Sequence, residues 1–513
     1  MKKLINDPQF VVDDMLDGLV LADNRLILLE GESTVVRADF QTLIDSNKVA
    51  LISGGGAGHE PAHGGYVGKG MLTAAVAGPV FTSPSVDAIL SAIRTVTGGT
   101  VFIHKIAGAA AEAGLGLDEV KAEARSAADG LYSMGLGLSA CTVPAAGKPG
   151  FVLEADEVEY GLGIHGESGV RRAVVESAQV MIRTLVERII EQGKLSADDR
   201  LALMVNNLGG TSVQELDIAA RQALAESAAY GLNIELVMVG TFLTALEMAG
   251  CSLTLMRIDD HIKTRLRAPS DTVAWHGMTV PSTKIERQSS PIMHRDADVQ
   301  GPSWSAAHAE KFKGAISSIS QALQQNEQLL TELDSVVGDG DIGISLARGA
   351  RAIDDGYDGI AFDHPALALQ QISAILRRVL GGTSGPLYAV FVLRAGLSLS
   401  TASSVESVAG WAQAVSKGCE GIQQLGGASA GDRTMLDALI PAARALAQSV
   451  EVDDILKISR EVANASSVGA ESTRDMLPLK GRSSYLGRRA LGHVDPGAYA
   501  ISIWLKAIVS SLE

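Results

Sequence analysis

The chain has 513 residues and a net charge of −16, with 46% hydrophobic but only 4% aromatic residues. This length is enough for two or three domains, the apolar content excludes a disordered chain, and the charge makes nucleic acids and anionic membranes poor partners. Three cysteines, Cys141, Cys251 and Cys419, lie far apart without a C-x-x-C pair, so neither a zinc site nor a disulfide framework is expected. There is no signal-peptide pattern and no run of about 18 apolar residues, so we expect a cytoplasmic protein.

Residues 1–265 are expected to form an α/β domain. Short apolar runs predict strands, and helical patterns alternate with them. The predicted strands lie at residues 49–53, 100–106, 201–208 and 234–240, and the predicted helices at residues 170–192 and 215–231. Because strand–helix alternation is typical of parallel sheets, we expect sheets rich in parallel pairs.

The second half of the chain has a different character. Residues 266–304 are rich in Pro, Ser and Thr without a sustained period, which predicts a linker. Residues 305–513 show apolar positions at three- and four-residue spacing, which predicts an all-α domain of six to eight helices. The helical patterns occupy residues 306–331, 343–355, 365–380, 405–423, 434–449, 453–475 and 484–489.

Three carboxylates stand close together in the stretch LTELDSVVGDGDIGIS, residues 330–345. They are Asp334, Asp339 and Asp341, and their repulsion favours a hard cation such as Mg²⁺, which commonly bridges to substrate phosphates. Glycines at 338, 340 and 343 would let the backbone turn sharply there. A solvated acidic turn that caps a helix remains the alternative.

A glycine-rich stretch, SGGGAGHEPAHGGYVGKG, follows the first predicted strand at residues 53–70. Backbone N–H groups of such a loop can bind a small anionic or hydroxylated ligand. The stretch matches neither the P-loop nor the dinucleotide-binding pattern. His59 and His63 lie inside it, and the alternative is a structural turn with solvated histidines.

A second histidine candidate lies in EYGLGIHGESG, residues 159–169. His165 is flanked by Gly163 and Gly166, with Glu167 two positions on. An imidazole beside a carboxylate suits acid–base or nucleophilic chemistry, although a purely structural histidine is also possible.

Three loops of the helical half pair glycine with hydroxyls or charges where helices would begin. The N–H groups of a helix start favour phosphate. The loops are LGGTSGPLY (380–388), GGASAGDRTMLDAL (426–439) and KGRSSYLGRRALGHVDPGA (480–498). Asp432 and Asp495 within them could equally be plain N-caps.

Together these motifs resemble the dihydroxyacetone kinases. The resemblance is carried, in family order and over nearly the whole chain, by SGGGAGHEP, CTVPAAGKP, GIHGE, MVNNLG, the D-x-x-x-x-D-x-D triplet, GGTSGPLY, GDRTM and GHVDPGA. More narrowly, the chain resembles the single-chain ATP-dependent type, in which a ketone-binding α/β domain of two subdomains is fused to a nucleotide-binding barrel of antiparallel helices. The fusion favours free ATP over phosphate delivered to a held ADP, and the family suggests a homodimer.

The resemblance implies a role for individual residues. His165 would add to the ketone carbonyl as a hemiaminal, the backbone of Gly56, Ala57 and Gly58 would hold the ketone, and His59 would be its acid–base partner. Asp334, Asp339 and Asp341 would hold two Mg²⁺ ions that bridge the ATP phosphates. The nucleotide-contact positions would be Ile342, Gly343, Ile344, Ser345, Thr383, Ser384, Gly426, Met435, Arg482, Asp495, Pro496 and Gly497.

The chain departs from the family between Gly99 and Thr100. Several dozen residues are absent there, among them a K-N-Y-T-G-D motif whose lysine and aspartate contact the ketone; the aspartate is the proposed catalytic base. His59, Glu60 or Glu167 could substitute for it. Smaller departures are Ile342 and Ile344, where the family has small hydroxylated residues, and Arg488, where it commonly has Glu.

The expected activity is therefore ATP-dependent phosphorylation of dihydroxyacetone, which feeds triose into glycolysis and serves glycerol metabolism. Three alternatives remain open: a kinase for another small ketose or aldose such as erythrulose or glyceraldehyde, an FMN cyclase-like lyase that uses the helical domain alone, and a catalytically impaired binding or regulatory paralogue.

Overall fold

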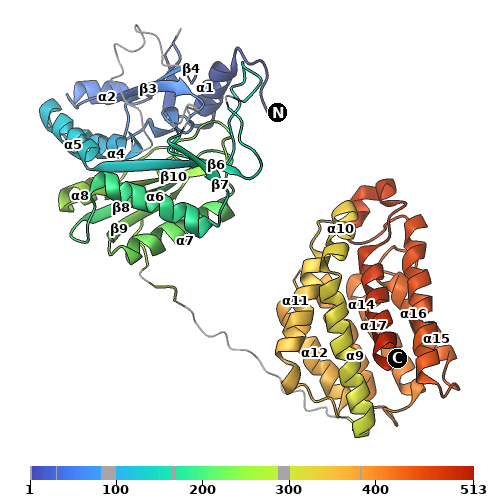
Figure 1. The fold of residues 1–513 in the computed structure, drawn as a ribbon. Coiled ribbons are helices and arrows are strands. Elements are labelled where there is room, and N and C mark those ends of the chain that lie inside the picture. Colours follow the sequence, from blue (N-terminus) through green and yellow to red (C-terminus); the bar gives the residue numbers. More distant parts are fainter. Residues whose placement is uncertain are drawn as a thin grey trace. The chain divides into compact units, whose positions relative to one another are not determined.

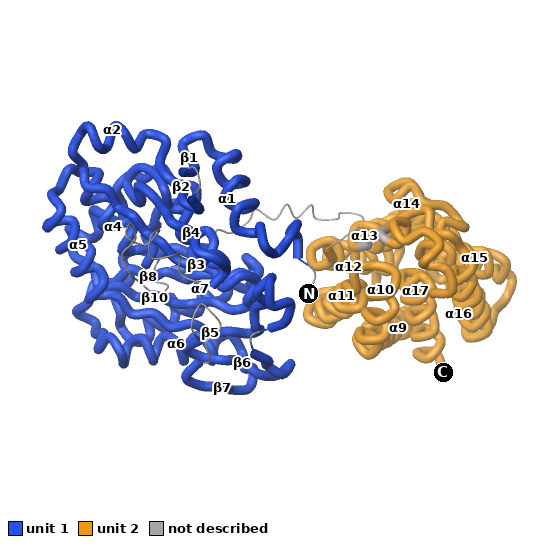
Figure 2. Tube along the Cα trace, turned by 90° about the horizontal axis from the view of Figure 1, so that it is seen from above, with its two compact units in different colours: residues 1–288 blue, residues 289–513 orange. Residues whose placement is uncertain are grey.

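The computed structural model describes residues 3–29, 32–81, 100–149, 151–162, 169–282, 284–286, 301–381 and 384–513. The chain forms two compact units, residues 1–288 and 289–513 (Figures 1 and 2). Unit 1 is the α/β part and the described part of unit 2 is helical. In the described residues, no helix is both long and apolar enough to cross a lipid bilayer.

Unit 1 contains two mixed sheets. The four-stranded sheet has the order β1-β2-β4-β3, so that β3 lies at an edge. Its strands are β1 (Leu26–Leu28), β2 (Thr34–Arg37), β3 (Ile52–Ala57) and β4 (Ala74–Val80), accompanied by α1 (Val11–Ala22), α2 (Phe40–Asp45), α4 (Thr100–Glu112) and α5 (Leu117–Asp129).

The six-stranded sheet has the order β7-β6-β5-β10-β8-β9. Its strands are β5 (Leu131–Gly137), β6 (Glu157–Tyr160), β7 (Arg171–Val174), β8 (Arg200–Asn207), β9 (Asn233–Gly240) and β10 (Gly250–Arg257), accompanied by α6 (Ala178–Gly193), α7 (Val213–Ala229) and α8 (Asp260–Arg267). Among the strands of the described residues, β3–β4 and β8–β9 pair in parallel and the other neighbouring strands pair antiparallel. The expected predominance of parallel pairs is therefore wrong, because strands such as β9 and β10 are joined by a short segment, residues 241–249, with no crossover helix.

The interior strand β8, between β10 and β9, shows why this sheet is buried on both faces. Its side chains alternate between two cores: Leu203 and Val205 pack with α6 and α7 in one cluster, whereas Ala202 and Met204 pack in another with residues of α1, α4 and the four-stranded sheet. Figure 1 shows α6 and α7 on the first of these faces. A run such as LALMVNN therefore lacks the polar alternation of a half-exposed strand.

Two local predictions in unit 1 are corrected. Residues 100–106, expected as a strand, form the start of α4, in which Val101, Phe102 and Ile106 are fully buried. A continuous apolar run cannot distinguish a buried helix from a strand. Residues 170–177, expected as helix, contain β7, and α6 begins only after its N-cap Ser177.

The predicted linker begins too early. Ala274 and Trp275 are buried in the core of unit 1, and Thr279 exchanges backbone hydrogen bonds with Val237 of β9. The Pro- and Ser-rich composition conceals these contacts, because a single buried tryptophan produces no periodic pattern.

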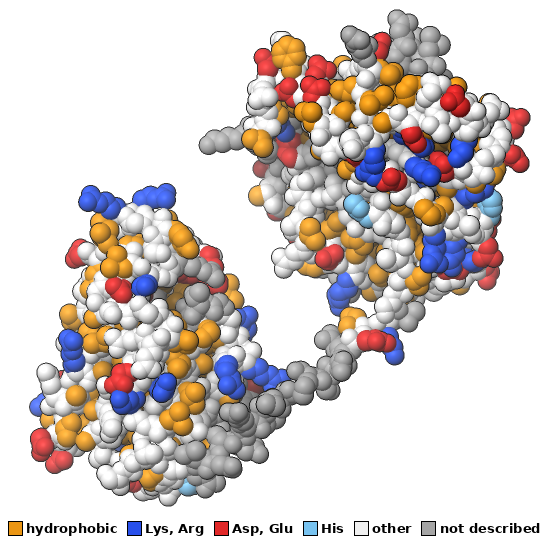
Figure 3. All heavy atoms as spheres, turned by 180° about the vertical axis from the view of Figure 1, so that it is seen from behind, with side chains coloured by type: hydrophobic (Ala, Val, Ile, Leu, Met, Phe, Trp, Pro, Cys, Tyr) orange, Lys and Arg blue, Asp and Glu red, His pale blue; other side chains and the backbone are white. Residues whose placement is uncertain are grey.

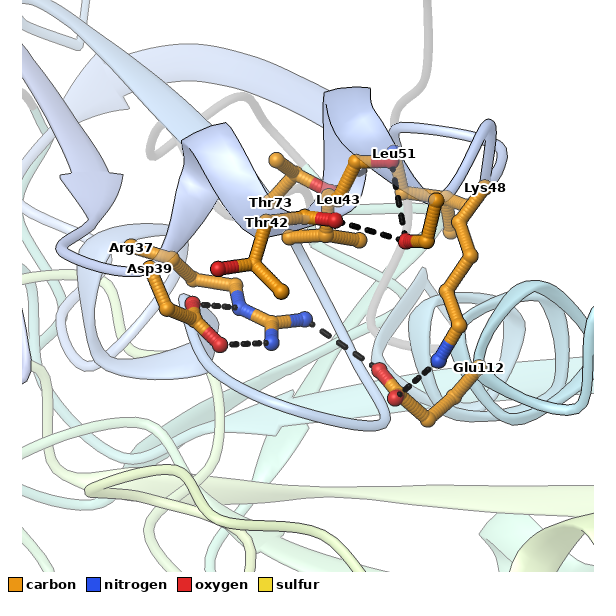
Figure 4. A network of polar contacts seen from close by, with 9 residues as sticks. Arg37, Asp39, Thr42, Leu43, Lys48, Leu51, Thr73 and Glu112 are labelled. Atoms are coloured by element: carbon orange, nitrogen blue, oxygen red, sulfur yellow. Dashed lines mark hydrogen bonds and ion pairs between the residues drawn. The ribbon is translucent and has the colours of Figure 1, made fainter.

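A polar network fastens the end of α4 to the four-stranded sheet (Figure 4). The buried Arg37 guanidinium donates to Asp39 at 2.7 and 2.8 Å and to Glu112 at 3.3 Å, and Lys48 donates to Glu112 at 2.7 Å. Helix α4 is thereby held against the sheet. On the face visible in Figure 3, acidic and basic side chains of unit 1 are interspersed.

The helices of unit 2 close into a barrel. Neighbouring contacts run from α9 through α11, α12, α13, α14, α15, α16 and α17 back to α9, and short connections make successive helices antiparallel. The helices are α9 (Ala306–Gln325), α10 (Glu327–Val337), α11 (Ile342–Asp355), α12 (Pro365–Val379), α13 (Ser384–Ser400), α14 (Val408–Gly426), α15 (Leu436–Gln448), α16 (Ile455–Ser472) and α17 (Pro496–Leu512), with a 3₁₀ segment η4 (Arg482–Ala490) before the last.

Helices α13 and α17 were not expected from the sequence. Both are apolar around most of their circumference, so no amphipathic period marks them. The single helix expected at 306–331 is two helices, because the chain leaves helical geometry at Asn326, between α9 and α10.

Gly343 lets α11 cross closely over α10. A Cβ at this position would clash with the Glu327 carbonyl and with Thr331. We predict that Gly343→Ala destabilises unit 2 by about 1–3 kcal/mol, the usual cost of overpacking, measured as a lower thermal unfolding midpoint. Gly314→Ala in α9, where a Cβ would meet nothing within 4 Å, is the control and should stabilise by up to about 1 kcal/mol. Equal midpoints for the two variants would contradict the packing role.

Candidate active site

The three aspartates of the predicted metal site converge between α10 and α11. Asp334 lies in the last turn of α10, Asp339 in the connecting loop, and Asp341 is the N-cap of α11. One oxygen from each carboxylate lies within 4.8 Å of the others. Asp334 is buried, whereas Asp339 and Asp341 are exposed. The sequence prediction that these residues meet is confirmed.

The Asp334 carboxylate determines the shape of this loop. Its Oδ2 accepts the backbone N–H groups of Asp341 at 2.9 Å and Ile342 at 3.2 Å. A Cβ on Gly338 would clash with the other carboxylate oxygen, and Gly340 has a φ of +75°. Both positions therefore require glycine, and the Asp-Gly-Asp turn is a defined structure that presents two further carboxylates.

The set of donors fits a hard divalent cation. Three carboxylates so close repel one another unless a cation lies among them, and oxygen ligands of this kind are what Mg²⁺ prefers. Asp334, Asp339 and Asp341 would hold it, and the exposed pair leaves room for phosphate oxygens on the open side.

A cavity of about 420 Å³ opens beside the aspartates. Seven of the predicted nucleotide-contact residues line it: Ile342, Ser345, Gly426, Met435, Asp495, Pro496 and Gly497. They come from α11, α14, α17 and the turn before α15. Segments distant in sequence therefore meet around one cavity, as the resemblance implied.

Two of the predicted contact residues do not line the cavity, and their role as nucleotide contacts stays a prediction. Gly343 packs against α10 and Ile344 is half exposed, and neither lines the cavity. On a helix only residues three or four apart share a face, so Ile342, Ser345 and Leu346 face the cavity and the two residues between do not. Thr383 lies outside the described residues, as do the side chains of Ser384 and Arg482.

The sequence analysis missed several lining residues, among them Tyr388, Thr434 and Lys480. The most unusual is Arg433, which is fully buried and donates to the carbonyls of Thr473, Ala490 and His493, at 3.2, 3.3 and 2.9 Å. Its Nη1 has no partner among the described residues. Arg433 was visible within GDRTM, but its bonds to carbonyls of the segment before α17 could not be read from that motif.

Asp495 is both an N-cap and a cavity residue. Its Oδ1 accepts the Ala498 N–H at 2.8 Å, and its own N–H donates to Thr473. Burial raises the pKa of Asp495 to about 6, Arg433 acts in the opposite direction, and Asp437 and Asp334 push the pKa further up. Asp432 does not line the cavity and caps a turn instead, accepting the Ser429 N–H at 2.7 Å.

In unit 1 the glycine-rich stretch is partly strand. Residues of β3 and the turn after it line a second cavity of about 450 Å³, together with Met15, Leu16 and Leu19 of α1. Gly56 and Ala57 line it, as predicted for a ketone-holding backbone, but Gly58 does not. Gly58 has a φ of +96° and directs its N–H to the Glu60 carboxylate.

The two histidines of this stretch lie in different surroundings. His59 is buried outside the cavity, where Nδ1 lies 2.7 Å from the Thr244 carbonyl oxygen and the ring stacks on Phe81. His63 lines the cavity, with Nδ1 3.1 Å from the Ser53 hydroxyl, which also contacts His104. The alternative of solvated histidines is therefore wrong for His59. His165 lies outside the described residues.

Comparison with known proteins identifies the family. Residues 17–99 and 94–274 match the Dak1 domain, and residues 336–510 match the DAK2 domain. The dihydroxyacetone kinase of Citrobacter freundii is 34% identical, with 99% of this chain and 98% of the relative covered. The chain belongs to the dihydroxyacetone kinase family.

The human triokinase/FMN cyclase is 35% identical over 100% of this chain and 99% of the relative, and the L-erythrulose 1-kinase of Mycolicibacterium smegmatis is 30% identical over 99% of each. The crystal structure of the Citrobacter freundii enzyme matches with a TM-score of 0.62 at 31% identity, over 99% of each chain. A second structure of that enzyme, in complex with AMP-PNP and Mg²⁺, matches with a TM-score of 0.61. The two-domain fold expected from the sequence is confirmed.

The family match is split at the expected gap. The two Dak1 segments meet at residues 94–99, and the alignment with the human relative runs over 578 residues although this chain has 513. The relative therefore carries residues without a counterpart here. Residues 82–99, which include the junction before Thr100, lie outside the described residues.

The aspartate cluster generates a prediction for metal-dependent binding. We predict that Asp341→Asn lowers the affinity for Mg²⁺-ATP at least about tenfold, since even outer-shell partners of a metal contribute that much. The fold should persist, because asparagine has the same shape as the exposed Asp341 side chain that it replaces. Isothermal calorimetry with and without Mg²⁺ measures the effect. Asp453→Asn, which removes an exposed carboxylate away from the cavity, is the control; equal affinities in both variants would refute the metal assignment.

Asp495 generates a prediction for stability. Its raised pKa, about 6 instead of 3.8, means that the folded chain binds a proton that the unfolded chain lacks between these pH values. Its contribution to stability is therefore present below pH about 4 and lost as the pH rises through about 6. Asp495→Asn is neutral at every pH. At pH 7.5 its free energy of unfolding should exceed that of the wild type by up to about 3 kcal/mol, so it should unfold at a higher temperature.

This difference between Asp495→Asn and the wild type should vanish below pH about 4. Thermal unfolding in EDTA without nucleotide checks it. A constant difference across the pH range would show that the carboxyl does not titrate in this window.

Proposed function

We propose that this chain phosphorylates dihydroxyacetone to dihydroxyacetone phosphate with ATP as the donor. The observation that carries the proposal is the convergence of Asp334, Asp339 and Asp341 at a cavity lined by the predicted nucleotide residues, in a chain that also carries the Dak1 unit. The Citrobacter relative bears the name dihydroxyacetone kinase, and its structure is described as a complex with AMP-PNP and Mg²⁺.

The nucleotide half of the proposal places ATP in the cavity of unit 2. The aspartates would hold two Mg²⁺ ions, which neutralise the phosphate charge during transfer. The three carboxylate oxygens lie within 4.8 Å of one another, which is close enough for them to share ions whose Mg–O distance is about 2.1 Å. The N-termini of α11 and α17 add N–H groups for phosphate oxygens, and Leu346, Leu387 and Ile422 provide apolar wall for the base.

The ketone half places dihydroxyacetone on the backbone of Gly56, Ala57 and Gly58. An imidazole nitrogen of His165 would add to the carbonyl carbon while the carbonyl oxygen gains a proton, which selects ketones over polyols. His59 would act as acid–base partner; its Nδ1 contact with the Thr244 carbonyl favours a tautomer with the proton on Nδ1. For the Gly58 backbone to hold the ketone, its N–H would have to be shared between the ketone and the Glu60 carboxylate.

Two relatives support specific alternatives. The erythrulose kinase of Mycolicibacterium smegmatis favours another small ketose as acceptor, and a cavity of about 450 Å³ has room for it. The human triokinase/FMN cyclase favours an FMN-forming lyase that uses unit 2 alone. The gap before Thr100 favours a binding or regulatory role.

We further propose that the chain acts as a homodimer in the cytoplasm. Size-exclusion chromatography with light scattering would test the dimer.

The proposal predicts sugar-dependent ADP release by the purified chain. With dihydroxyacetone, ATP and Mg²⁺, we expect turnover that is slower than that of complete family members because the aspartate-bearing segment is absent, and the loss should be at most about 10²- to 10⁴-fold, the usual contribution of a general base. A coupled ADP assay with dihydroxyacetone, erythrulose and glyceraldehyde ranks the acceptors.

The same preparation separates the alternatives. FMN formation from FAD without sugar identifies the lyase, and ketone binding without ADP release identifies the regulatory paralogue. His165→Ala should abolish turnover while nucleotide affinity is unchanged. Wild-type rates in this variant would show that no hemiaminal forms on His165.

A further inference from the structure

The cavity of unit 1 contains a carboxylate to which the family resemblance assigns no role of its own. Glu60 lies in the turn after β3 and lines the cavity together with the backbone of Gly55, Gly56 and Ala57. Its two carboxylate oxygens lie 3.0 and 3.2 Å from the backbone nitrogen of Gly58. The carboxylate is therefore fixed on the backbone segment to which the proposed function assigns the ketone.

The environment of Glu60 suits a proton acceptor. Among the described residues no cation forms an ion pair with it, and its recorded partner is the neutral Gly58 N–H. Burial raises the pKa of Glu60, and its hydrogen bonds act in the opposite direction. A carboxylate whose pKa is raised towards the working pH is a stronger base than an ordinary one.

The other ionisable side chain that lines this cavity is less suitable. Burial, and to a lesser extent the neighbouring His59, lowers the pKa of His63 to about 4. His63 is therefore a neutral and weak base at pH 7. Its Nδ1 is engaged by Ser53, whose hydroxyl also contacts the buried His104, which fixes the ring orientation. His63 can hydrogen-bond a sugar hydroxyl but is a poor final acceptor for its proton.

We infer that Glu60 is the catalytic base of this chain and takes the role of the aspartate in the absent segment. The inference rests on the proposed kinase function. In the transfer step, the ketone hydroxyl oxygen forms a bond to the γ-phosphorus and the bond from that phosphorus to the bridging oxygen breaks. ADP leaves with that electron pair, and the hydroxyl proton passes to the Glu60 carboxylate, which later releases it to water.

Replacement of Glu60 by glutamine tests the inference while preserving the local shape, since the amide oxygen can still accept the Gly58 N–H. We expect Glu60→Gln to lower kcat with dihydroxyacetone about 10²- to 10⁴-fold, with ketone and ATP affinities by calorimetry within about twofold of the wild type. Glu32→Gln, which neutralises an exposed carboxylate of the same unit, is the control and should leave kcat unchanged. A Glu60→Gln kcat equal to that of the wild type overturns the inference.

A second variant keeps the test decisive if glutamine disturbs folding. Glu60→Ala opens space beside Gly58, and added formate should restore part of the rate of this variant, severalfold or more, without affecting Glu32→Ala. Failure of formate to raise the rate of Glu60→Ala also overturns the inference. The experiments separate failure of this inference from failure of the proposed function. Absence of ADP release by the wild type overturns both, whereas normal turnover in Glu60→Gln overturns only the role of Glu60.

Discussion

The contact between the Asp334 carboxylate and the first N–H groups of α11 is the constraint on which the nucleotide site depends. It brings the end of α10 and the start of α11 to one point, requires glycine at position 338, and places Asp339 and Asp341 on the short loop between. The N-terminus of α11 carries partial positive charge, which offsets part of the repulsion among the carboxylates. A divalent cation, which could also bind phosphate, would neutralise the remaining negative charge of the carboxylates.

The aspartate loop was predictable from sequence because everything that defines it lies within a few residues. The spacing of Asp334, Asp339 and Asp341 and the intervening glycines contain the whole geometry. The barrel around it was only partly predictable. Helices α13 and α17 carry no amphipathic signal, because neighbours in the ring cover most of their surface. Arg433 shows the same limit, since its three carbonyl partners belong to a distant segment.

In unit 1, the residue pattern alone does not distinguish His59 from His63 within one glycine-rich loop, and only the family resemblance singled out His59. The fold separates them, because the turn after β3 sends one ring towards Phe81 and Thr244 and the other towards the cavity beside α1. Which of the two histidines faces the cavity thus depends on the direction of the backbone and not on the residue type. The parallel sheets expected from strand–helix alternation failed for a related reason: alternation records the order of elements and not the direction in which the next strand enters the sheet.

The ring of helices in unit 2 has a consequence for synthesis of the chain. The ring closes by contact between α9 and α17, which are the first and last helices of the unit. The cavity likewise combines Asp334, near the start, with Asp495 and Gly497, near the C-terminus. A chain that has been synthesised only as far as α16 therefore has neither a closed ring of helices nor a complete cavity, so this unit cannot reach its final packing before α17 is available.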